Sequence, residues 1–382
     1  MRVCYTGQEY LIHGIPHPRV PFLIDKEMRE VTAANRFLEE IAIVEGTTAD
    51  SPGTWKTYGE HLCSFFANLE EIGVNWYEVT ETHVAVWRNK QRKDGWGKRK
   101  KKCAVTTVNQ RVATVCRFYA WALEKGMIAQ LPFRRKTLRI PGGAAEGRWG
   151  RRTTKNSLTL QDFEGPIRIL SEGEMSKFLP VLGKGWLHLA GRLMGEAGLR
   201  REEAAGLTIH VLPDCTSCGS GDWVRMDLDP ELTPTKGAKF RWVELPADLA
   251  AELFQYKTVV RPLLAAIYRV RYGKEPDVLF LNRYGEPVSL KGVNNRFTRA
   301  SKKTGINCCP HILRHTWATL SLLRKLDEGH GPSLALFWLR DRLGHESIAT
   351  TQRYIHLLWE AGRDTLLRHQ ETITAMLAGE RI

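Results

Sequence analysis

The stretch between residues 131 and 165 constrains the fold more than any other feature, because no regular core accommodates it. It combines two prolines, several glycines between 142 and 150, and six arginines. Glycine and proline interrupt helices and strands, and closely spaced arginines favour solvent or an anionic partner over burial. A chain of 382 residues is also longer than most single cores. We therefore predict two domains joined by a flexible basic linker.

The part before the linker has helical periodicity. Apolar and aromatic residues recur every three or four positions in Thr54–Leu69, Thr80–Lys90 and Thr106–Leu123, and Gly126 follows the last of these segments. The first thirty residues show no clear period. This pattern predicts an all-α first domain.

The part after the linker mixes helical and strand patterns. Ser171 and Glu174 have the spacing of a capping box, and Gly198 follows an apolar helix at Gly185–Ala197. Three β-like runs come next, at Leu207–Leu212, Asp222–Leu228 and Phe240–Leu245. A long helix is then expected over Ala247–Tyr272 and a short strand over Val278–Leu281, followed by helices with breaks near Gly305, Gly329 and Gly344. We predict an α+β domain, mainly helical with one small antiparallel sheet. The predicted order is an extension at 1–30, a helical domain at 31–130, the linker at 131–165 and the α+β domain at 166–382.

Positive charge is concentrated in the middle of the chain. The net charge is +14, and residues 90–155 alone contain 19 lysines and arginines against three acidic residues. Such a field attracts polyanions, of which nucleic acid is the commonest. A solvated basic surface is the alternative. The candidate DNA contacts are Lys98, Arg99, Lys100, Lys101, Lys102, Arg134, Arg135, Arg151 and Arg152.

Four groups of polar residues in the second domain are not explained by core packing. They lie in Gly198–Glu203, Thr235–Lys239, Pro310–Thr316 and the pair Leu343–Ser347 and Thr350–His356. Each group alone is weak evidence, since His311 and Arg314, for example, would also share a helix face as an ordinary surface pair. In this order and at these spacings they resemble the catalytic boxes of the tyrosine recombinases, the phage integrase family.

The resemblance implies both a fold and a set of roles. The first domain looks like the family's SAM-like core-binding domain, which binds DNA, and the second like its catalytic domain. By position, the catalytic residues are Arg200, Lys236, His311, Arg314, His345 and the nucleophile Tyr354, with Glu203 as a supporting acid. The implied function is site-specific recombination through a covalent 3′-phosphotyrosyl intermediate. The implied partner is double-stranded DNA, and no cofactor is needed. We also predict a homotetramer on paired DNA sites, because residues 358–378 form an amphipathic segment that either folds back on its own core or docks on a neighbouring copy.

The chemistry of these side chains fits that reaction. A tyrosine hydroxyl has a pKa of about 10, so it attacks phosphorus only with help from cations or a base. A guanidinium donates to two oxygens of a phosphate at once. Histidine relays protons near neutral pH, and a lysine such as Lys236 can protonate the departing 5′-oxygen. The phosphotyrosine retains the energy of the broken bond, so resealing needs neither ATP nor a metal ion.

Other interpretations of the same residues remain open. A type IB topoisomerase shares the tyrosine chemistry, and a DNA-binding regulator of the same fold would have lost cleavage. Cys215 and Cys218 have the spacing of half a zinc site, although one such pair is weak evidence. The resemblance also includes one departure, because the stretch from Arg314 to His345 is longer than in simple members, with Lys325–Pro332 as the expected extra loop. No run of 18 apolar residues is present, so we expect no membrane association and a cytoplasmic, nucleoid-associated protein.

Overall fold

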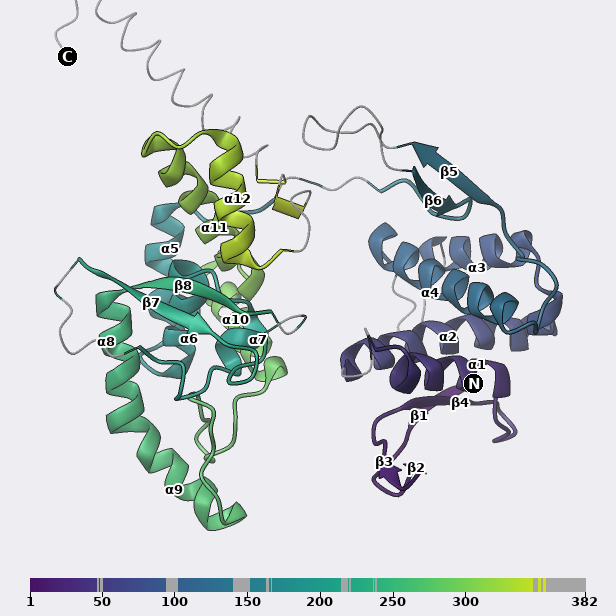
Figure 1. Ribbon diagram of the computed structural model, residues 1–382, viewed down its shortest axis with the longest axis horizontal. Helices are drawn as coiled ribbons and strands as arrows, with labels where there is room; N and C mark the ends of the chain where they lie inside the picture. Colours follow the sequence, from purple (N-terminus) through teal and green to yellow (C-terminus); the bar gives the residue numbers. More distant parts are fainter. Residues whose placement is uncertain are drawn as a thin grey trace, which may run out of the picture. The chain divides into compact units, whose positions relative to one another are not determined.

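The computed structural model of the chain divides into two compact units, Met1–Glu164 and Gly165–Ile382 (Figure 1). It describes residues 1–46, 48, 51–93, 102–139, 152–162, 165, 167–213, 219, 221–235, 237, 239–345, 350–351 and 353–354. Within that part of the chain, every helix is too short or too polar to cross a bilayer.

Unit 1 is built on a helical core. Its helices are α1 (Thr32–Glu39) with a π-helical turn at Glu40–Val44, α2 (Pro52–Ile72), α3 (Glu81–Lys93) and α4 (Val105–Glu124). A short 3₁₀ turn spans Trp76–Glu78. Aromatic rings fill the centre, where the Phe118 ring lies 5.7 Å from Phe37 and 5.5 Å from both Phe66 and Trp76, in edge-to-face contacts. The three predicted helices are confirmed, whereas α1 was not foreseen because no capping side chain marks its start.

Residues 1–30 contain regular structure that the sequence did not indicate. Strand β1 (Arg2–Tyr5) pairs with β4 (Pro21–Ile24), and β2 (Leu11–Ile12) pairs with β3 (Ile15–Pro16). Leu23 of β4 is fully buried in the core of unit 1. Gly59 of α2 allows this close approach, since a Cβ there would lie 2.8 Å from the Pro21 side chain. The N-terminal residues are therefore part of the helical unit's packing.

The segment expected to be a flexible linker contains a two-stranded ribbon. Strand β5 (Arg135–Arg139) pairs with β6 (Arg152–Asn156) in antiparallel register, from Arg135 opposite Asn156 to Arg139 opposite Arg152. The segment that follows β6 is anchored to the helices. Arg88 of α3 donates to the Leu158 carbonyl at 2.7 Å, and the Asn109 amide of α4 exchanges two 2.9 Å hydrogen bonds with the Leu160 backbone.

Unit 2 surrounds one small hairpin with helices. Its helices are α5 (Glu172–Phe178), α6 (Trp186–Glu196), α7 (Arg201–Ala205), α8 (Ala247–Gln255), α9 (Arg261–Tyr272), α10 (Leu290–Thr304), α11 (Pro310–Asp327) and α12 (Pro332–Leu343). A 3₁₀ turn at Leu179–Leu182 follows α5, and a π-helical turn at Tyr256–Val260 joins α8 to α9. The hairpin pairs β7 (Trp223–Leu228) with β8 (Arg241–Pro246). The predicted α+β architecture is confirmed.

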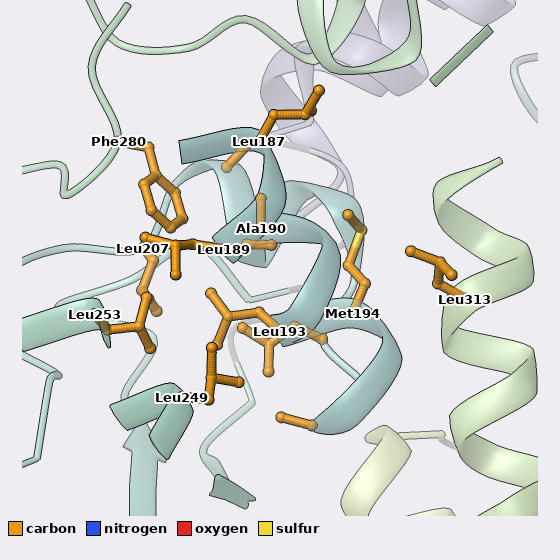
Figure 2. Packing of buried hydrophobic residues seen from close by; sticks show 14 of the residues in the cluster. Leu187, Leu189, Ala190, Leu193, Met194, Leu207, Leu249, Leu253, Phe280 and Leu313 are labelled. Carbon is orange, nitrogen blue, oxygen red and sulfur yellow. The ribbon is translucent and has the colours of Figure 1, made fainter. Parts of the chain in front are cut away.

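Helix α6 lies at the centre of this unit. Figure 2 shows Leu193 of α6 beside Leu249 of α8, while Met194 faces Leu313 of α11. The packing of α11 against α6 matters for function, because α11 carries two of the candidate catalytic residues.

Several local predictions for unit 2 can be compared with the structure. The capping box of Ser171 and Glu174 opens α5 with both of its hydrogen bonds. The first β-like run is reduced to a single bridge between Thr208 and Val278. The expected extra loop is also shorter than predicted, since α11 extends to Asp327 and α12 begins at Pro332.

Candidate active site

The backbone before α7 places Arg200. Gly198 has a φ of +68°, and a Cβ at this position would lie 2.2 Å from the Trp317 ring. Glycine is therefore required both by the backbone conformation and by the close approach of α11. This turn brings Arg200 to the N-cap position of α7.

Glu203 forms the centre of a cluster of arginines. Its carboxylate is 1% exposed and accepts hydrogen bonds from the Arg200 backbone N–H at 2.6 Å, from Arg200 Nη1 at 2.9 Å and from Arg241 Nη2. Arg314 Nη1 lies 3.8 Å from the same carboxylate. Burial alone would raise the pKa of Glu203, but the charges of Arg241 and Arg314 outweigh it and the pKa is lowered. The carboxylate is therefore ionised at neutral pH.

The arginines of this cluster also hold the end of α12. Arg241 donates to the Arg342 carbonyl, Arg314 to the Leu343 carbonyl at 2.6 Å, and Arg200 to the Gly344 carbonyl at 3.0 Å. A helix C-terminus carries unpaired carbonyls and partial negative charge, so cations bind there favourably. These contacts fix the start of the segment that leads to His345 and Tyr354.

The cluster carries excess positive charge. Three guanidiniums surround one carboxylate, and Arg314 is only 2% exposed. Burial and the neighbouring cations Arg241 and Arg200 lower the pKa of Arg314 to about 9, so it stays charged at neutral pH. An anion that enters the site would relieve this excess.

Tyr354 is a buried phenol in contact with a histidine. The residue is 3% exposed and belongs to an apolar cluster with Trp317, Leu339 and others. Its hydroxyl lies 2.7 Å from Nδ1 of His315 on α11. Burial raises the pKa of Tyr354, and the charge of Arg314 opposes part of that effect. The hydroxyl is therefore protonated at neutral pH and forms a hydrogen bond with His315.

His345 and His311 lie on the two segments that flank the cluster. His345 Nδ1 is 3.0 Å from the Thr351 hydroxyl, and burial together with Arg314 lowers the pKa of His345 to about 4. His311, in the first turn of α11, is exposed, and its ring centroid lies 4.1 Å from that of His315. Partial desolvation, followed by the charge of Arg314, lowers the pKa of His311. Both imidazoles are therefore neutral at physiological pH.

A cavity of about 790 Å³ opens beside these groups. Its lining residues come from α7, α10 and α11 and from the residues just before α7 and α11, and they are Arg200, Arg201, Glu202, Asn294, Phe297, Thr298, Cys308, Cys309, Pro310, His311 and Arg314. Two guanidiniums from the Glu203 cluster therefore face a space large enough for a phosphodiester.

The structure brings five of the six sequence-predicted catalytic residues together in one site, with His311 and Tyr354 both in contact with His315. Arg200 and Arg314 both lie against the Glu203 carboxylate. His345 comes directly after Leu343 and Gly344, whose carbonyls accept hydrogen bonds from these two arginines. Lys236 lies outside the described residues. Two members of the site were missed by the sequence analysis, namely Arg241 and His315.

A signal for each missed residue exists in the sequence. Arg241 is in phase with Val243 and Leu245, the inward-facing residues of β8, so it occupies a buried position of an alternating strand. His315 follows His311 by four residues and therefore shares its face of α11. Neither signal is specific. The first shows only that the side chain is buried and the second only which face of the helix it occupies, and neither identifies the residue that it contacts.

The predicted DNA contacts are only partly described. Lys98, Arg99, Lys100, Lys101 and Arg151 lie outside the described residues, as do Cys215 and Cys218. Lys102, Arg134 and Arg135 are exposed, and Arg152 begins β6. Among the residues that the structure does describe, no group of three or more His, Cys, Asp or Glu side chains has the geometry of a metal site.

Comparison with known proteins identifies the family. The model of the phage integrase family matches residues 170–360, which is half of the chain, and the model of the phage integrase N-terminal SAM-like domain matches residues 34–126. The chain belongs to the phage integrase family. It is a tyrosine-type site-specific DNA recombinase with the predicted pair of domain types.

Relatives support this assignment along most of the chain. The tyrosine recombinase XerC of Listeria monocytogenes serotype 4a (strain HCC23) is 26% identical over 328 residues, which cover 84% of this chain and 92% of the relative. The XerC protein of Serratia marcescens is 27% identical over 318 residues, covering 80% and 85%.

Solved structures share the fold. The XerH recombinase bound to its difH substrate before cleavage has a TM-score of 0.52 at 18% identity, covering 89% of this chain and 90% of that one. A lambda integrase dimer bound to a COC′ core site has a TM-score of 0.53 at 16% identity, covering 85% and 94%.

Proposed function

We propose that this recombinase cleaves DNA with Tyr354 as the nucleophile and that the Glu203 cluster binds the phosphodiester under attack. The single observation that carries the proposal is the buried Tyr354 hydroxyl, hydrogen-bonded to His315, which follows Arg314 of a cluster of arginines with excess positive charge. The phenolic oxygen attacks phosphorus, a 3′-phosphotyrosyl bond forms, and the 5′-oxygen leaves. The reverse attack by a second 5′-hydroxyl rejoins the strand.

Arg200 and Arg314 are the proposed phosphate ligands. Both line the cavity, and a guanidinium can donate to two non-bridging oxygens whose charge increases in the transition state. Removal of one preorganised donor of this kind typically lowers the rate by roughly 10²–10³. Arg241 acts differently, because it is buried against Glu203 and the Arg342 carbonyl and orients the other two arginines.

His345 and His311 are proposed to donate hydrogen bonds to the same phosphate. His345 follows the Gly344 carbonyl that Arg200 holds, and His311 lines the cavity. Lys236 is proposed as the acid that protonates the 5′-oxygen. It lies five residues before Arg241 in the sequence, and Arg241 is the first residue of β8 and contacts Glu203.

The proposed partner is double-stranded DNA, contacted partly by the basic ribbon. Lys98, Arg99, Lys100, Lys101 and Lys102 precede α4, and Arg134, Arg135, Arg151 and Arg152 belong to the ribbon and its flanks. Charge complementarity supports this surface, since phosphate neutralisation supplies most non-specific affinity for DNA. The finer proposal is that four copies act together on two DNA sites in the nucleoid. Recombination exchanges four strands, which requires four nucleophiles.

A suicide substrate tests the proposed function. Cleavage of a nicked duplex by Tyr354 loses a short 5′ fragment, so the covalent DNA–protein product accumulates and can be counted on a denaturing gel. We expect the wild-type chain to form this product and Tyr354→Phe to bind the same duplex without forming it. A covalent product in Tyr354→Phe would assign the nucleophile to another residue. If the wild-type chain binds the duplex but forms no covalent product, the alternative of a DNA-binding regulator that has lost cleavage would be favoured instead.

Relaxation of plasmid DNA separates the topoisomerase alternative. A type IB enzyme relaxes supercoils on any sequence as a single copy, whereas a recombinase needs paired sites. We therefore expect recombination between two specific sites and little relaxation of plasmids that lack them. Efficient relaxation of site-free plasmid by the chain at low concentration would contradict the proposal.

A further inference from the structure

His315 is the described residue whose side chain is hydrogen-bonded to the Tyr354 hydroxyl. Its Nδ1 lies 2.7 Å from that oxygen, within the range of a strong hydrogen bond. His315 is half-buried on α11, next to Arg314 in the chain and one turn after His311. His345, by contrast, has its Nδ1 directed at the Thr351 hydroxyl. His311 lines the cavity on the side of the proposed phosphate site.

The surroundings of this hydrogen bond favour an uncharged phenol and an uncharged imidazole. Burial keeps the Tyr354 phenol protonated, so its O–H is available as a donor. Burial, followed by the charges of His311 and Arg314 on α11 and of Arg353 and His345 on the segment after α12, lowers the pKa of His315 to about 3. A neutral imidazole has one nitrogen without a proton. In the tautomer that carries the ring proton on Nε2, Nδ1 accepts the hydrogen bond of the phenol.

We propose that His315 is the proton acceptor for Tyr354 in the cleavage step. As the Tyr354 oxygen forms its bond to phosphorus, the O–H electron pair stays on that oxygen and the proton passes to Nδ1 of His315. The bond between phosphorus and the 5′-oxygen breaks, and the 5′-oxygen takes a proton from the acid of the site. In the rejoining step the attacking 5′-hydroxyl gives its proton back to the acid of the site, and the His315 imidazolium returns its proton to the departing phenolic oxygen, so no proton is gained or lost over one cycle. This inference rests on the proposed function of Tyr354 as the nucleophile.

Substrate binding turns His315 into an effective base. In the DNA-free protein, the cations Arg314 and Arg353 oppose a proton on His315. A phosphodiester bound to Arg200 and Arg314 brings a negative charge into the same site, and the transition state adds a second. These charges favour the imidazolium and raise the proton affinity of His315 at the moment when the phenol must be deprotonated. The free protein thus keeps its nucleophile protonated until a phosphate occupies the cavity.

The test measures single-turnover cleavage of the suicide substrate by the full-length chain. His315→Ala is expected to cleave roughly 10²–10⁴-fold more slowly than wild type at neutral pH, which is the usual contribution of a general base. The deficit should shrink about tenfold per pH unit as hydroxide replaces the missing base, up to the pKa of the Tyr354 phenol, which burial raises above the usual value of about 10. Imidazole added to the buffer should accelerate His315→Ala in proportion to its neutral form. It should leave wild type and His330→Ala, an exposed histidine of the same unit, unchanged.

A second variant separates proton transfer from positioning. His315→Gln retains a hydrogen-bond acceptor of similar reach but cannot accept a proton, so it should remain as slow as His315→Ala. If His315→Gln restores the wild-type rate, or if the deficit does not change with pH or imidazole, His315 only positions Tyr354 and the proposal is wrong. A duplex with a 5′-bridging sulfur should not rescue either variant, because His315 does not protonate the leaving group. If the wild-type chain itself forms no covalent product, the proposed function fails and not this inference alone.

Discussion

Replacement of Glu203 by glutamine tests the central claim about the site, that one carboxylate balances several buried guanidiniums. The substitution removes a negative charge from a residue that is 1% exposed and leaves Arg200, Arg241 and Arg314 without a counter-ion. Breaking a buried ion pair from one side typically costs about 3–5 kcal/mol, because a buried charge stays uncompensated. For a unit of this size that corresponds to a fall in melting temperature of roughly 6–20 °C.

The assay is thermal and urea unfolding of the full chain, with Glu202→Gln as the matched control. Glu202 is the adjacent residue, but its side chain is 49% exposed and pairs with Arg201 at the surface. Exposed pairs of this kind contribute about 0–1 kcal/mol, so the control should melt close to wild type. If Glu203→Gln lowers the free energy of unfolding by less than about 1 kcal/mol, the reasoning is refuted, because the three cations would then not be held by this carboxylate.

The pH dependence provides an independent check on the same cluster. The pKa of Glu203 is lowered in the folded protein, so its contribution to stability is complete above its unfolded pKa of about 4.3 and is lost as the pH falls through the folded value. The stability difference between wild type and Glu203→Gln should therefore be constant from pH 5 to 8. This difference in the free energy of unfolding should become smaller only in more acidic solution. A difference that disappears near pH 6 would point to histidine titration instead.

Two further predictions concern the leaving group and the basic ribbon. Lys236→Ala should be severely slow on ordinary DNA and nearly normal on a duplex with a 5′-bridging sulfur, since a thiolate, with a conjugate acid near pKa 8.5 for cysteine, leaves without protonation. If Lys236→Ala slows cleavage equally on both substrates, Lys236 is not the acid that protonates the 5′-oxygen. Replacing Lys136 and Lys155 together by glutamine should reduce the slope of log affinity against log salt by up to about 2, as two phosphate contacts are lost. Thr154→Pro, which keeps every charge but interrupts the pairing with Thr137, should also weaken binding if the ribbon acts as a formed structure, and unchanged affinity would show that only its charge matters.

The helices of unit 2 could be predicted from the sequence because their ends are marked by residue type. Gly305 and Gly344 follow α10 and α12 with φ values of +71° and +60°, the left-handed conformation in which glycine terminates helices. The capping box of Ser171 and Glu174 marks the start of α5 in the same way. These signals are local, so a single sequence contains all the information that they require.

The ribbon and the missed site residues depend on contacts that no local pattern specifies. Strands β5 and β6 are short, basic and without apolar alternation, so their sequence resembles an exposed linker until the pairing of residues 13 or more positions apart is known. His315 meets Tyr354 across 39 positions, and Arg241 meets Glu203 across 38. The motifs therefore predicted which segments form the site but not which of their side chains touch.

The partners of the arginines explain how the site can be both rigid and strongly cationic. Arg314 donates to the carbonyls of Gly198 and Leu343, and Arg200 donates to the carbonyl of Gly344. A carbonyl orients a guanidinium without neutralising it, whereas a carboxylate does both. With Glu203 as the one carboxylate bound to the cluster among the described residues, most of the positive charge remains for a phosphate. The carbonyls belong to the turn before α7 and to the end of α12, so the geometry of the proposed phosphate site depends on two glycines, Gly198 and Gly344, whose conformations end those segments. A substitution of either glycine should therefore displace the arginines, although it replaces none of the charged residues of the site.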